Sequence, residues 1–485
     1  MRPKVSFLSD DLIETIISEA KKILSGIGIE IQNKTVVALL KNHGAKTDKS
    51  ASRLYINEEI INASLDSVPG SFQLYNNKGD LTNDFSGMNV HFTPGSAALN
   101  ILDYESGKMR KPETVDYINY VKIADQLKYI ASQSTAMIPS DVVSEISDSY
   151  RLFLSLLYSS KPVVTGTFRA ESFQIMKDML VLIRGSEEKL AEKPLAVFSC
   201  CPTSPLKWSD VTSQNVIDCA RYKIPVEFIS MPLSGFAAPV TLVGTLIQHT
   251  AETLSGIVIS QLASPGTPVL YGGSPAVFDV RYETTPMGAI ETMMIDCAYN
   301  EIGKYLGIPT QAYIALTDAK APDAQAGLET GIGATLAALS GINNISGPGM
   351  IDFESCISLE KLVLDNEICG MMFRMLKGIE AKEDFPSIPL FEELLSEGHL
   401  LISKHTRKYL REEQFFPGNI INRANNARWA EEGSLTLRQR AHNEAANLVK
   451  SYEPEVLEED SVNKLVKLMS KEASKFGQNK LPERI

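Results

Sequence analysis

Uncharged polar residues and aromatic residues stand at the ends of several short apolar runs in this chain. In the clearest case, an apolar run over residues 267–271 ends at Tyr271 and is followed by two glycines and a serine. Ring faces and neutral polar groups suit a quaternary ammonium ion, which has no N–H to donate and gains ~0.5–2 kcal/mol from each good contact with a ring. The positions of this kind are Phe92, Thr93, Gln133, Ser134, Thr165, Phe168, Ser199, Tyr271, Gly272, Tyr313, Thr317, Asn344 and Ser346.

Alternate residues of a strand face opposite sides, so about half of these positions would line a pocket. Each aromatic residue in the set has an alternative place in the hydrophobic core. His249 lies inside an apolar helical segment, and we interpret it as a structural histidine. We expect the substrate site to be drawn from Phe92, Gln133, Thr165, Phe168, Tyr271, Tyr313, Asn344 and Ser346.

The charged groups that other chemistries require are sparse at these positions. The histidines are scattered, with His91 alone near the end of an apolar run, so we expect no metal site. Asp279, Asp318 and Asp352 lie a few residues beyond their runs, and no nucleophile elbow, phosphate-binding loop or dinucleotide fingerprint is present. No residue is therefore assigned as catalytic. Lys320 stands close to a run, which leaves a Schiff-base lyase or aldolase as an alternative.

Eight successive segments repeat the same features in the same order: an apolar run, small polar residues and then a helix. These repeats must position the side chains named above. Eight repeats over about 270 residues are typical of a (β/α)8 TIM barrel, whereas a doubly wound sheet usually has fewer strands and a glycine-rich first turn. We therefore predict an α/β fold with a TIM barrel whose site lies at the C-terminal ends of the strands. The predicted strands are 90–93, 129–133, 162–166, 195–199, 225–230, 267–271, 310–315 and 343–346.

The segments on either side of the repeats have a different pattern. Residues 1–87 predict a small α/β region packed on the barrel, and residues 88–355 form the barrel, the expected catalytic domain. Residues 356–485 predict a helical region that would offer a surface for a homo-oligomer.

Composition excludes several classes of protein. The 485 residues carry a net charge of −12, which argues against nucleic-acid binding. No apolar run is long enough to span a membrane, and the N-terminus lacks the pattern of a secretory signal. The six cysteines lack C-x-x-C spacing, so we expect reduced thiols in a cytoplasmic protein.

Three stretches resemble the trimethylamine methyltransferase superfamily of corrinoid-dependent enzymes. They are residues 231–241 (MPLSGFAAPVT), 317–327 (TDAKAPDAQAG) and 405–412 (HTRKYLRE). The resemblance covers the barrel and the C-terminal region, and it implies a TIM barrel that transfers a methyl group from an amine to the Co(I) of a separate corrinoid protein. It also implies that no cofactor is bound permanently.

The founding members of that family carry pyrrolysine in the barrel mouth, whereas this chain has ordinary residues throughout. It is therefore similar to the non-pyrrolysine branch, whose members demethylate quaternary amines such as glycine betaine, carnitine or proline betaine. The resemblance makes glycine betaine, which would give dimethylglycine, the first expectation. For its carboxylate, the expected donors by position are Gln133, Thr165, Arg169, Asn344 and Ser346. A betaine-binding protein without catalysis is the remaining alternative.

Overall fold

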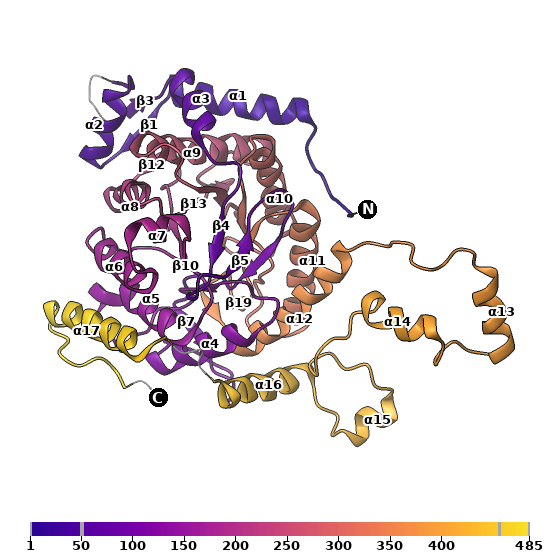
Figure 1. Cartoon of the computed structure of the whole chain (residues 1–485). Helices are drawn as coiled ribbons and strands as arrows, with labels where there is room; N and C mark the ends of the chain where they lie inside the picture. The colour runs from indigo at the N-terminus through magenta and orange to yellow at the C-terminus, as the bar shows by residue number, and fades with distance from the viewer. Residues whose placement is uncertain (1, 49–52, 454–456, 484–485) are drawn as a thin grey trace.

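Parallel strands form the centre of the computed structural model, which describes residues 2–48, 53–453 and 457–483 (Figure 1). The strands are β6 (His91–Thr93), β9 (Gln133–Ser134), β10 (Val163–Thr165), β11 (Ala196–Cys200), β13 (Val226–Ser230), β15 (Val269–Gly273), β17 (Gln311–Tyr313) and β18 (Asn344–Ser346). They pair in the orders β9-β10-β11-β13-β15 and β17-β18-β6. Parallel bridges from Tyr271 to Thr310 and from Phe92 to Ile130 join the two groups at both ends. Within the described residues, eight parallel strands thus close into a ring, and each overlaps one predicted strand.

Helices on the outside of the strand ring follow the strands in order. They are α4 (Thr114–Gln126), η1 (Ser144–Ile146), α5 (Ser147–Tyr158), α6 (Ser172–Arg184), α7 (Glu187–Glu192), α8 (Asp210–Arg221), α9 (Leu242–Ala263), α10 (Ile290–Tyr305), α11 (Ala324–Ser340) and α12 (Leu359–Leu376). The last of them, α12, packs against both α11 and α4 and so completes the outer layer. The predicted boundary after residue 355 separates α12 from the helices on which it packs.

Short strands extend the loops that follow the ring strands. β7 (Asn100–Leu102), β8 (Met109–Arg110), β19 (Met350–Ile351) and β20 (Cys356–Ile357) form one sheet in the order β19-β20-β7-β8. β14 (Leu233–Ser234) and β16 (Ala276–Val277) also follow ring strands, and they pair in parallel with each other. Because these strands come after the carboxyl ends of ring strands, they build the rim at which a site is expected.

The helices of the N-terminal region pack mainly on α9, outside the strand ring, and its β4–β5 hairpin packs on the ring itself. Its elements are α1 (Asp10–Gly26), β1 (Ile29–Ile31), α2 (Lys34–Asn42), β2 (Lys46–Thr47), β3 (Arg53–Tyr55), α3 (Glu58–Ser67), β4 (Gln73–Tyr75) and β5 (Leu81–Asp84). Phe72, Leu74 and Phe85, in and beside the β4–β5 hairpin, form an apolar cluster with Val197 and Leu270 of the ring. β12 (Lys207–Trp208), from the loop after β11, pairs with β1. The region is thus attached to the strand ring and its loops through shared core and shared sheet.

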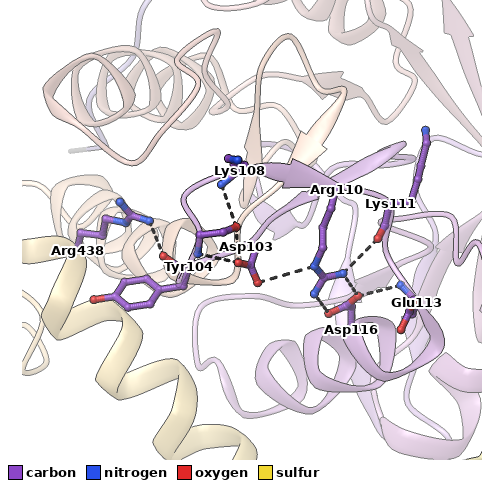
Figure 2. Close-up of polar contacts among 9 residues, drawn as sticks. Asp103, Tyr104, Lys108, Arg110, Lys111, Glu113, Asp116 and Arg438 are labelled. Carbon is purple, nitrogen blue, oxygen red and sulfur yellow. Dashed lines mark hydrogen bonds and ion pairs between the residues drawn. The ribbon is translucent and has the colours of Figure 1, made fainter.

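The C-terminal helices either pack on the outer layer or extend away from it (Figure 1). The helices α16 (Leu437–Ser451) and α17 (Glu459–Lys475) pack on α4 and α12 and on α5 and α6, respectively. Figure 2 shows Arg438 of α16 reaching the β7–β8 hairpin, where it donates a hydrogen bond to the carbonyl oxygen of Tyr104. The donor–acceptor distance is 3.1 Å, and the Tyr104 ring also stacks on the ring of His442 of α16. The remaining helices, α13 (Ile388–Glu397), α14 (Lys404–Glu413) and α15 (Asn426–Glu431), lie in the excursion between α12 and α16. In the described part of the chain, no helix has the length and apolar character to cross a membrane.

Close packing at the end of β15 gives a prediction about Gly273. A Cβ at Gly273 would lie 2.3 Å from His249 Nε2, and His249 cannot easily withdraw because its ring stacks on Tyr299 at 4.2 Å. We expect Gly273→Ala to lower the free energy of unfolding by about 1–3 kcal/mol. Gly327→Ala on α11 is the matched control, because nothing lies within 4 Å of its Cβ and alanine favours a helix. Urea denaturation of both variants measures the difference, and equal stabilities would contradict the packing argument.

Candidate functional site

A cluster of hydrogen-bonded side chains lies inside the strand ring. The carboxylate of Glu227 on β13 accepts hydrogen bonds from Ser199 Oγ at 2.7 Å and from Asn344 Nδ2 at 3.2 Å. Thr93 Oγ1 donates to Asn344 Oδ1 at 2.8 Å. Since β13 and β18 are not neighbours in the ring, the bond from Asn344 to Glu227 must cross its interior. These side chains therefore face inward and define the floor of a candidate site.

Glu227 is wholly buried, and this burial changes its acidity. Desolvation raises the pKa of the Glu227 carboxyl to about 7, while the hydrogen bonds from Ser199 and Asn344 act in the opposite direction. The group thus passes between its neutral and charged forms near neutral pH. A buried carboxylate of this kind attracts a cation far more strongly than one in water does.

A second buried carboxyl, Glu354, comes from the turn between β19 and β20. Three successive residues, Asp352, Phe353 and Glu354, have φ of 51°, 56° and 71°, a region that costs each side chain about 1–3 kcal/mol. Glu354 Oε1 is buried and has no hydrogen-bond partner among the described residues. Burial raises the pKa of this carboxyl well above its usual range, with a smaller opposing effect from the backbone of Ser96. Strained geometry and an unpartnered oxygen are typical of a ligand-binding position.

Tyr313 lies close to both carboxyls. Its hydroxyl is 3.1 Å from Ser96 Oγ, and burial followed by the charges of Glu227 and Glu354 raises its pKa. Burial, followed by the effects of Cys200 and of the same two carboxyls, raises the pKa of the Cys201 thiol to about 12. Cys201 is therefore a protonated thiol and a poor nucleophile at neutral pH.

The two glycines after Tyr271 leave room for a polar side chain from the next strand. Gln311 Oε1 accepts a hydrogen bond from the backbone N–H of Gly273 at 3.2 Å, and a Cβ at Gly272 would come within 2.5 Å of this oxygen. The amide nitrogen Nε2 of Gln311 is buried and has no partner among the described residues. Gln311 thus offers a free donor beside the cluster.

A buried cation, Arg151 of α5, lies on the same rim. Its Nη1 donates to the carbonyl oxygen of Thr135 at 2.8 Å, and its guanidinium lies over the Phe168 ring at 4.5 Å from the centroid. In the described part of the chain, Arg151 forms no ion pair with a carboxylate, and the charge of Asp148 acts on it from farther away. Burial lowers the pKa of Arg151, although an arginine keeps its charge at neutral pH. A buried charge without a paired carboxylate is costly, which favours an anionic ligand here.

Three of the predicted site residues belong to this cluster. Tyr313 and Asn344 make the contacts described above, and Asn344 Nδ2 also lies 3.5 Å from Ser346 Oγ. Of the wider set of positions, Thr93 and Ser199 are members as well. The structure therefore brings together residues from the two sides of the ring, β6 and β18 on one side and β11 and β13 on the other.

The two aromatic residues Phe92 and Tyr271 point the other way, toward the helices. The Phe92 ring packs edge-on against Phe373 of α12 at 5.7 Å. The hydroxyl of Tyr271 donates to Thr250 Oγ1 of α9 at 2.9 Å. Both side chains are fully buried between the strand ring and the helices, so neither offers its ring to a ligand in the interior. His249 beside Tyr271 has the structural role we expected, since its Nε2 lies 3.0 Å from the carbonyl oxygen of Gly272.

The remaining predicted residues also lie apart from the cluster. Gln133 donates from Nε2 to the carbonyl oxygen of Val121 in α4 at 3.0 Å and so faces outward. Thr165 pairs in register with Phe198, whose ring packs on Phe173 of α6, and therefore shares its outward direction. Phe168 is 48% exposed in the loop after β10, at the rim beside Arg151. The predicted carboxylate donor Arg169 lies over the ring of Phe476 and is paired with Glu171.

The sequence interpretation missed Glu227, Glu354, Gln311 and Arg151. The sequence does contain a signal for Glu227, because a lone carboxylate inside an apolar strand is uncommon unless it has a function. Gln311 likewise stands within a predicted strand. Glu354 and Arg151 gave no such signal, since a tight turn and a helix bring them to the site.

Two other kinds of chemistry are not supported by the geometry. Within the described residues, no three His, Cys, Asp or Glu side chains gather in a way that could hold a metal ion. The side chain of Lys320 is 59% exposed and lies 3.5 Å from Asp352 in an ion pair. Schiff-base chemistry normally uses a lysine that is buried in the site, and the Lys320 side chain is largely exposed.

Comparison with known proteins gives one family and several relatives. A family model described as trimethylamine methyltransferase (MTTB) matches residues 1–477. The chain is 30% identical to trimethylamine methyltransferase MttB of Methanosarcina thermophila over 464 residues, covering 94% of this chain and 95% of the relative. It is 29% identical to the glycine betaine methyltransferase of Desulfitobacterium hafniense (strain Y51) over 478 residues, covering 98% and 99% of the two chains.

Among solved structures, the chain is similar to the monomethylamine methyltransferase MtmB of Methanosarcina barkeri. The TM-score is 0.51 at 13% sequence identity, and the match covers 98% of this chain and 89% of that one. At this identity the likeness concerns the fold alone.

Proposed function

Since the chain belongs to the trimethylamine methyltransferase family, we propose that it moves a methyl group from a quaternary amine, with glycine betaine as the first candidate, to the Co(I) of a corrinoid carried by a separate protein. We also assign its ring of strands and outer helices as a (β/α)8 TIM barrel. The observation that supports the substrate class best is the presence of the buried carboxyl of Glu227, the buried Oε1 of Glu354 and the buried guanidinium of Arg151. A betaine is a zwitterion, so its cationic end matches the carboxyls and its anionic end matches the arginine.

The inward carboxyls would hold the ammonium end of this substrate. Glu227, ionised above its pKa of about 7, supplies the charge, and Tyr313 supplies a ring face and a hydroxyl. Glu354 brings the unpartnered oxygen described above. Desolvation inside the ring strengthens each of these interactions, and fixed side chains aim one methyl group toward the open rim.

The charge of the substrate explains why no strong acid is required. The nitrogen of a quaternary amine is already positive, so the N–CH3 bond breaks with its electron pair remaining on nitrogen, and a neutral amine leaves. The corrinoid supplies the nucleophile from outside the chain. The residues of the chain bind, orient and exclude water, which agrees with a site that has carboxyls for a cation and no nucleophile of its own.

Arg151 favours a betaine over trimethylamine, which lacks a carboxylate. Its guanidinium is buried beside Thr135, next along the chain to Ser134, whose hydroxyl donates to the carbonyl oxygen of Gly95 at 2.9 Å. Gly95 in turn precedes Ser96, which contacts Tyr313. These contacts link the arginine to the cluster along one side of the rim. Carnitine and proline betaine have the same two charged ends and are the alternative substrates.

The cysteines agree with a reducing compartment, and on this basis we place the reaction in the cytoplasm. All six cysteines have free thiols in the structure. Disulfides are rare in cytosolic proteins and common in secreted ones.

The test is a methyl-transfer assay with a Co(I) corrinoid, free or on a corrinoid protein. We expect absorption of the methylated corrinoid to appear with glycine betaine, carnitine or proline betaine, and not with trimethylamine. Absence of transfer from all three betaines would refute the proposed function. Transfer from trimethylamine alone would keep the reaction and refute the substrate class.

Arg151→Met is expected to weaken the binding of a betaine through its carboxylate. Loss of a charge-assisted hydrogen bond to a carboxylate costs about 1.5–3 kcal/mol, so KM for the betaine should rise about 10- to 100-fold. Thermal unfolding measures whether the variant is folded, and Arg169→Met, at the paired surface arginine nearby, is the control. An equal loss in both variants, or none in either, would remove Arg151 from the substrate site.

A further inference from the structure

The peptide unit between Gly272 and Gly273, at the end of β15, is held from both sides. On the outer side, His249 Nε2 of α9 lies 3.0 Å from the carbonyl oxygen of Gly272. On the inner side, the N–H of Gly273 donates to Gln311 Oε1 at 3.2 Å. The C=O and the N–H of one trans peptide point in opposite directions. One planar unit therefore connects a side chain behind the strand to a side chain inside the strand ring.

Both of these contacts require glycine. A Cβ at Gly272 would lie 2.5 Å from Gln311 Oε1, and a Cβ at Gly273 would come closer still to His249 Nε2. A larger residue at either position would therefore displace one of the two side chains that hold the peptide. The pair of glycines is explained by this close approach from both sides.

The chemistry of His249 sets the direction of its hydrogen bond. The ring is wholly buried, and burial lowers the pKa of His249 to about 3, so the imidazole is neutral. A carbonyl oxygen can only accept, so the hydrogen of the neutral ring is on Nε2 and is donated to Gly272. The other ring nitrogen, Nδ1, is buried and has no partner among the described residues. His249 is thus a neutral donor behind the strand.

Tyr299 of α10 holds the same part of the strand ring. Its hydroxyl lies 3.0 Å from the carbonyl oxygen of Gly273 and 3.0 Å from that of Gln311, and so it joins β15 to β17. Its ring stacks on His249 at 4.2 Å between centroids. Side chains from two outer helices therefore hold both the peptide and the backbone from which the Gln311 side chain extends.

These contacts determine which end of the Gln311 amide is free. Because Oε1 accepts from the N–H of Gly273, the donor Nε2 must occupy the other position. Gln311 pairs in register with Asn344, whose side chain crosses the interior, and it therefore shares that inward direction. Its Nε2 is buried and has no partner among the described residues. A buried donor without an acceptor is costly, which favours a ligand that carries an acceptor atom.

In the proposed substrate, the acceptor can only be a carboxylate oxygen. A quaternary nitrogen has no lone pair, and glycine betaine has no polar group other than its carboxylate. Tyr313 follows Gln311 by two residues and lies on the same face of β17. After burial, which lowers the pKa of Arg151, Tyr313 is one of the nearby groups that act on this arginine. Gln311 and Arg151 are thus two donors for one carboxylate.

We propose that Gln311 binds the carboxylate of the substrate with an amide that the outer helices hold in place. His249 and Tyr299 are the positioning residues, and they act through the peptide between the two glycines without touching the substrate. This inference rests on the proposed function, because the acceptor belongs to the proposed class of substrate.

Isothermal titration calorimetry with glycine betaine and with tetramethylammonium tests these roles, since the second cation has no acceptor atom. Gln311→Met should raise Kd for glycine betaine about 10- to 100-fold, the effect of losing a hydrogen bond to a charged group. Tyr299→Phe and His249→Leu should each raise it at least about threefold, and all three variants should bind tetramethylammonium like the unmodified chain. His249→Gln keeps a donor near the position of Nε2 and should restore most of the affinity. Tyr271→Phe, which removes a buried hydroxyl bonded to α9, is the matched control and should bind both cations normally.

A double variant separates positioning from structural damage. If His249 acts on the substrate only through Gln311, then His249→Leu should add nothing to the effect of Gln311→Met. Thermal unfolding shows whether each variant is folded, and Tyr299→Phe, which removes a single oxygen atom, replaces His249→Leu if that variant does not fold. Additive losses, or equal losses for the two cations, would overturn the positioning roles.

Crystal structures without ligand test the positioning separately from the substrate. In His249→Leu and Tyr299→Phe the Gln311 amide should shift away from the N–H of Gly273, and in His249→Gln it should stay. An amide that does not move in the first two variants would overturn the positioning roles. Shifted amides in a chain that binds no betaine would support the positioning roles, and would refute both the proposed substrate and the contact of Gln311 with a carboxylate.

Discussion

Glu227→Gln is expected to lower kcat/KM for a quaternary amine by about 100- to 1,000-fold at pH 8, because the amide removes the charge that holds the ammonium in a desolvated site. The amide keeps the size of the carboxyl; its carbonyl oxygen can accept the hydrogen bond from Asn344, and its NH2 group can donate to Ser199 Oγ, which reverses the direction of that bond. The variant should therefore fold and retain the geometry of the cluster. Steady-state methyl transfer from glycine betaine measures the effect.

The dependence on pH follows from the raised pKa of Glu227, about 7. With the unmodified chain, kcat/KM should rise about tenfold per pH unit below this value and level off above it, since the ionised form binds the cation. Glu227→Gln should remove the rise. Glu19→Gln, which deletes a charge on α1 far from the strand ring, is the control that should preserve the profile. A flat profile in the unmodified chain would contradict the role of Glu227.

Stability should change in the opposite sense to activity. The folded pKa of Glu227 lies above the usual value of 4.5, so the free energy of unfolding falls as pH rises from 4.5 to about 7. Above this window the ionised, buried carboxyl lowers stability by about 3 kcal/mol relative to its protonated form. Glu227→Gln is not subject to this loss and should be the more stable protein at pH 8. A variant that is inactive and also less stable would point to a structural role for Glu227.

The position of every ring strand was predictable, whereas the direction of its side chains was not. Runs such as the one before Tyr271 identify strands because parallel strands buried on both faces are apolar throughout. The same property hides which face is inward, since the strands near Phe92 and Tyr271 have apolar residues on both sides. A shift of one residue along a strand turns the side chain from the interior of the ring toward the outer helices. For this reason Tyr271 was predicted to lie in the site together with Tyr313 and Asn344, whereas its side chain faces α9.

Residues that reach the site from elements outside the strand ring could not be predicted from the sequence pattern. Glu354 enters through a turn in which three residues that are not glycine have positive φ, and no local pattern predicts such a turn. Arg151 reaches the rim from a helix whose residues are otherwise largely buried by packing. Only the folded chain shows that both approach the segment around Gly95 and Ser96.

Lys361→Met is expected to lower the free energy of unfolding by about 3–5 kcal/mol at pH 7, because it leaves a buried carboxylate without its partner. Lys361 and Asp365, one turn apart on α12, form an ion pair whose side chains are 0% and 1% exposed. Asp365 also accepts a hydrogen bond from the backbone N–H of Gly349 at 2.7 Å. The pair thus attaches the helix that completes the outer layer to the loop that follows β18.

The size of this effect should depend on pH and on the second partner. Burial raises the pKa of Asp365 and the charge of Lys361 opposes the rise, so in Lys361→Met the carboxyl should take up a proton more readily and the loss should shrink as pH falls. Lys361→Met combined with Asp365→Leu should cost less than Lys361→Met alone, since no charge is then left buried. Lys464→Met removes an exposed pair of the same spacing, with Asp460, and should have little effect. Equal losses in the exposed and buried variants would mean that α12 is held by its apolar packing alone, and that the ion pair adds nothing to the attachment of the rim.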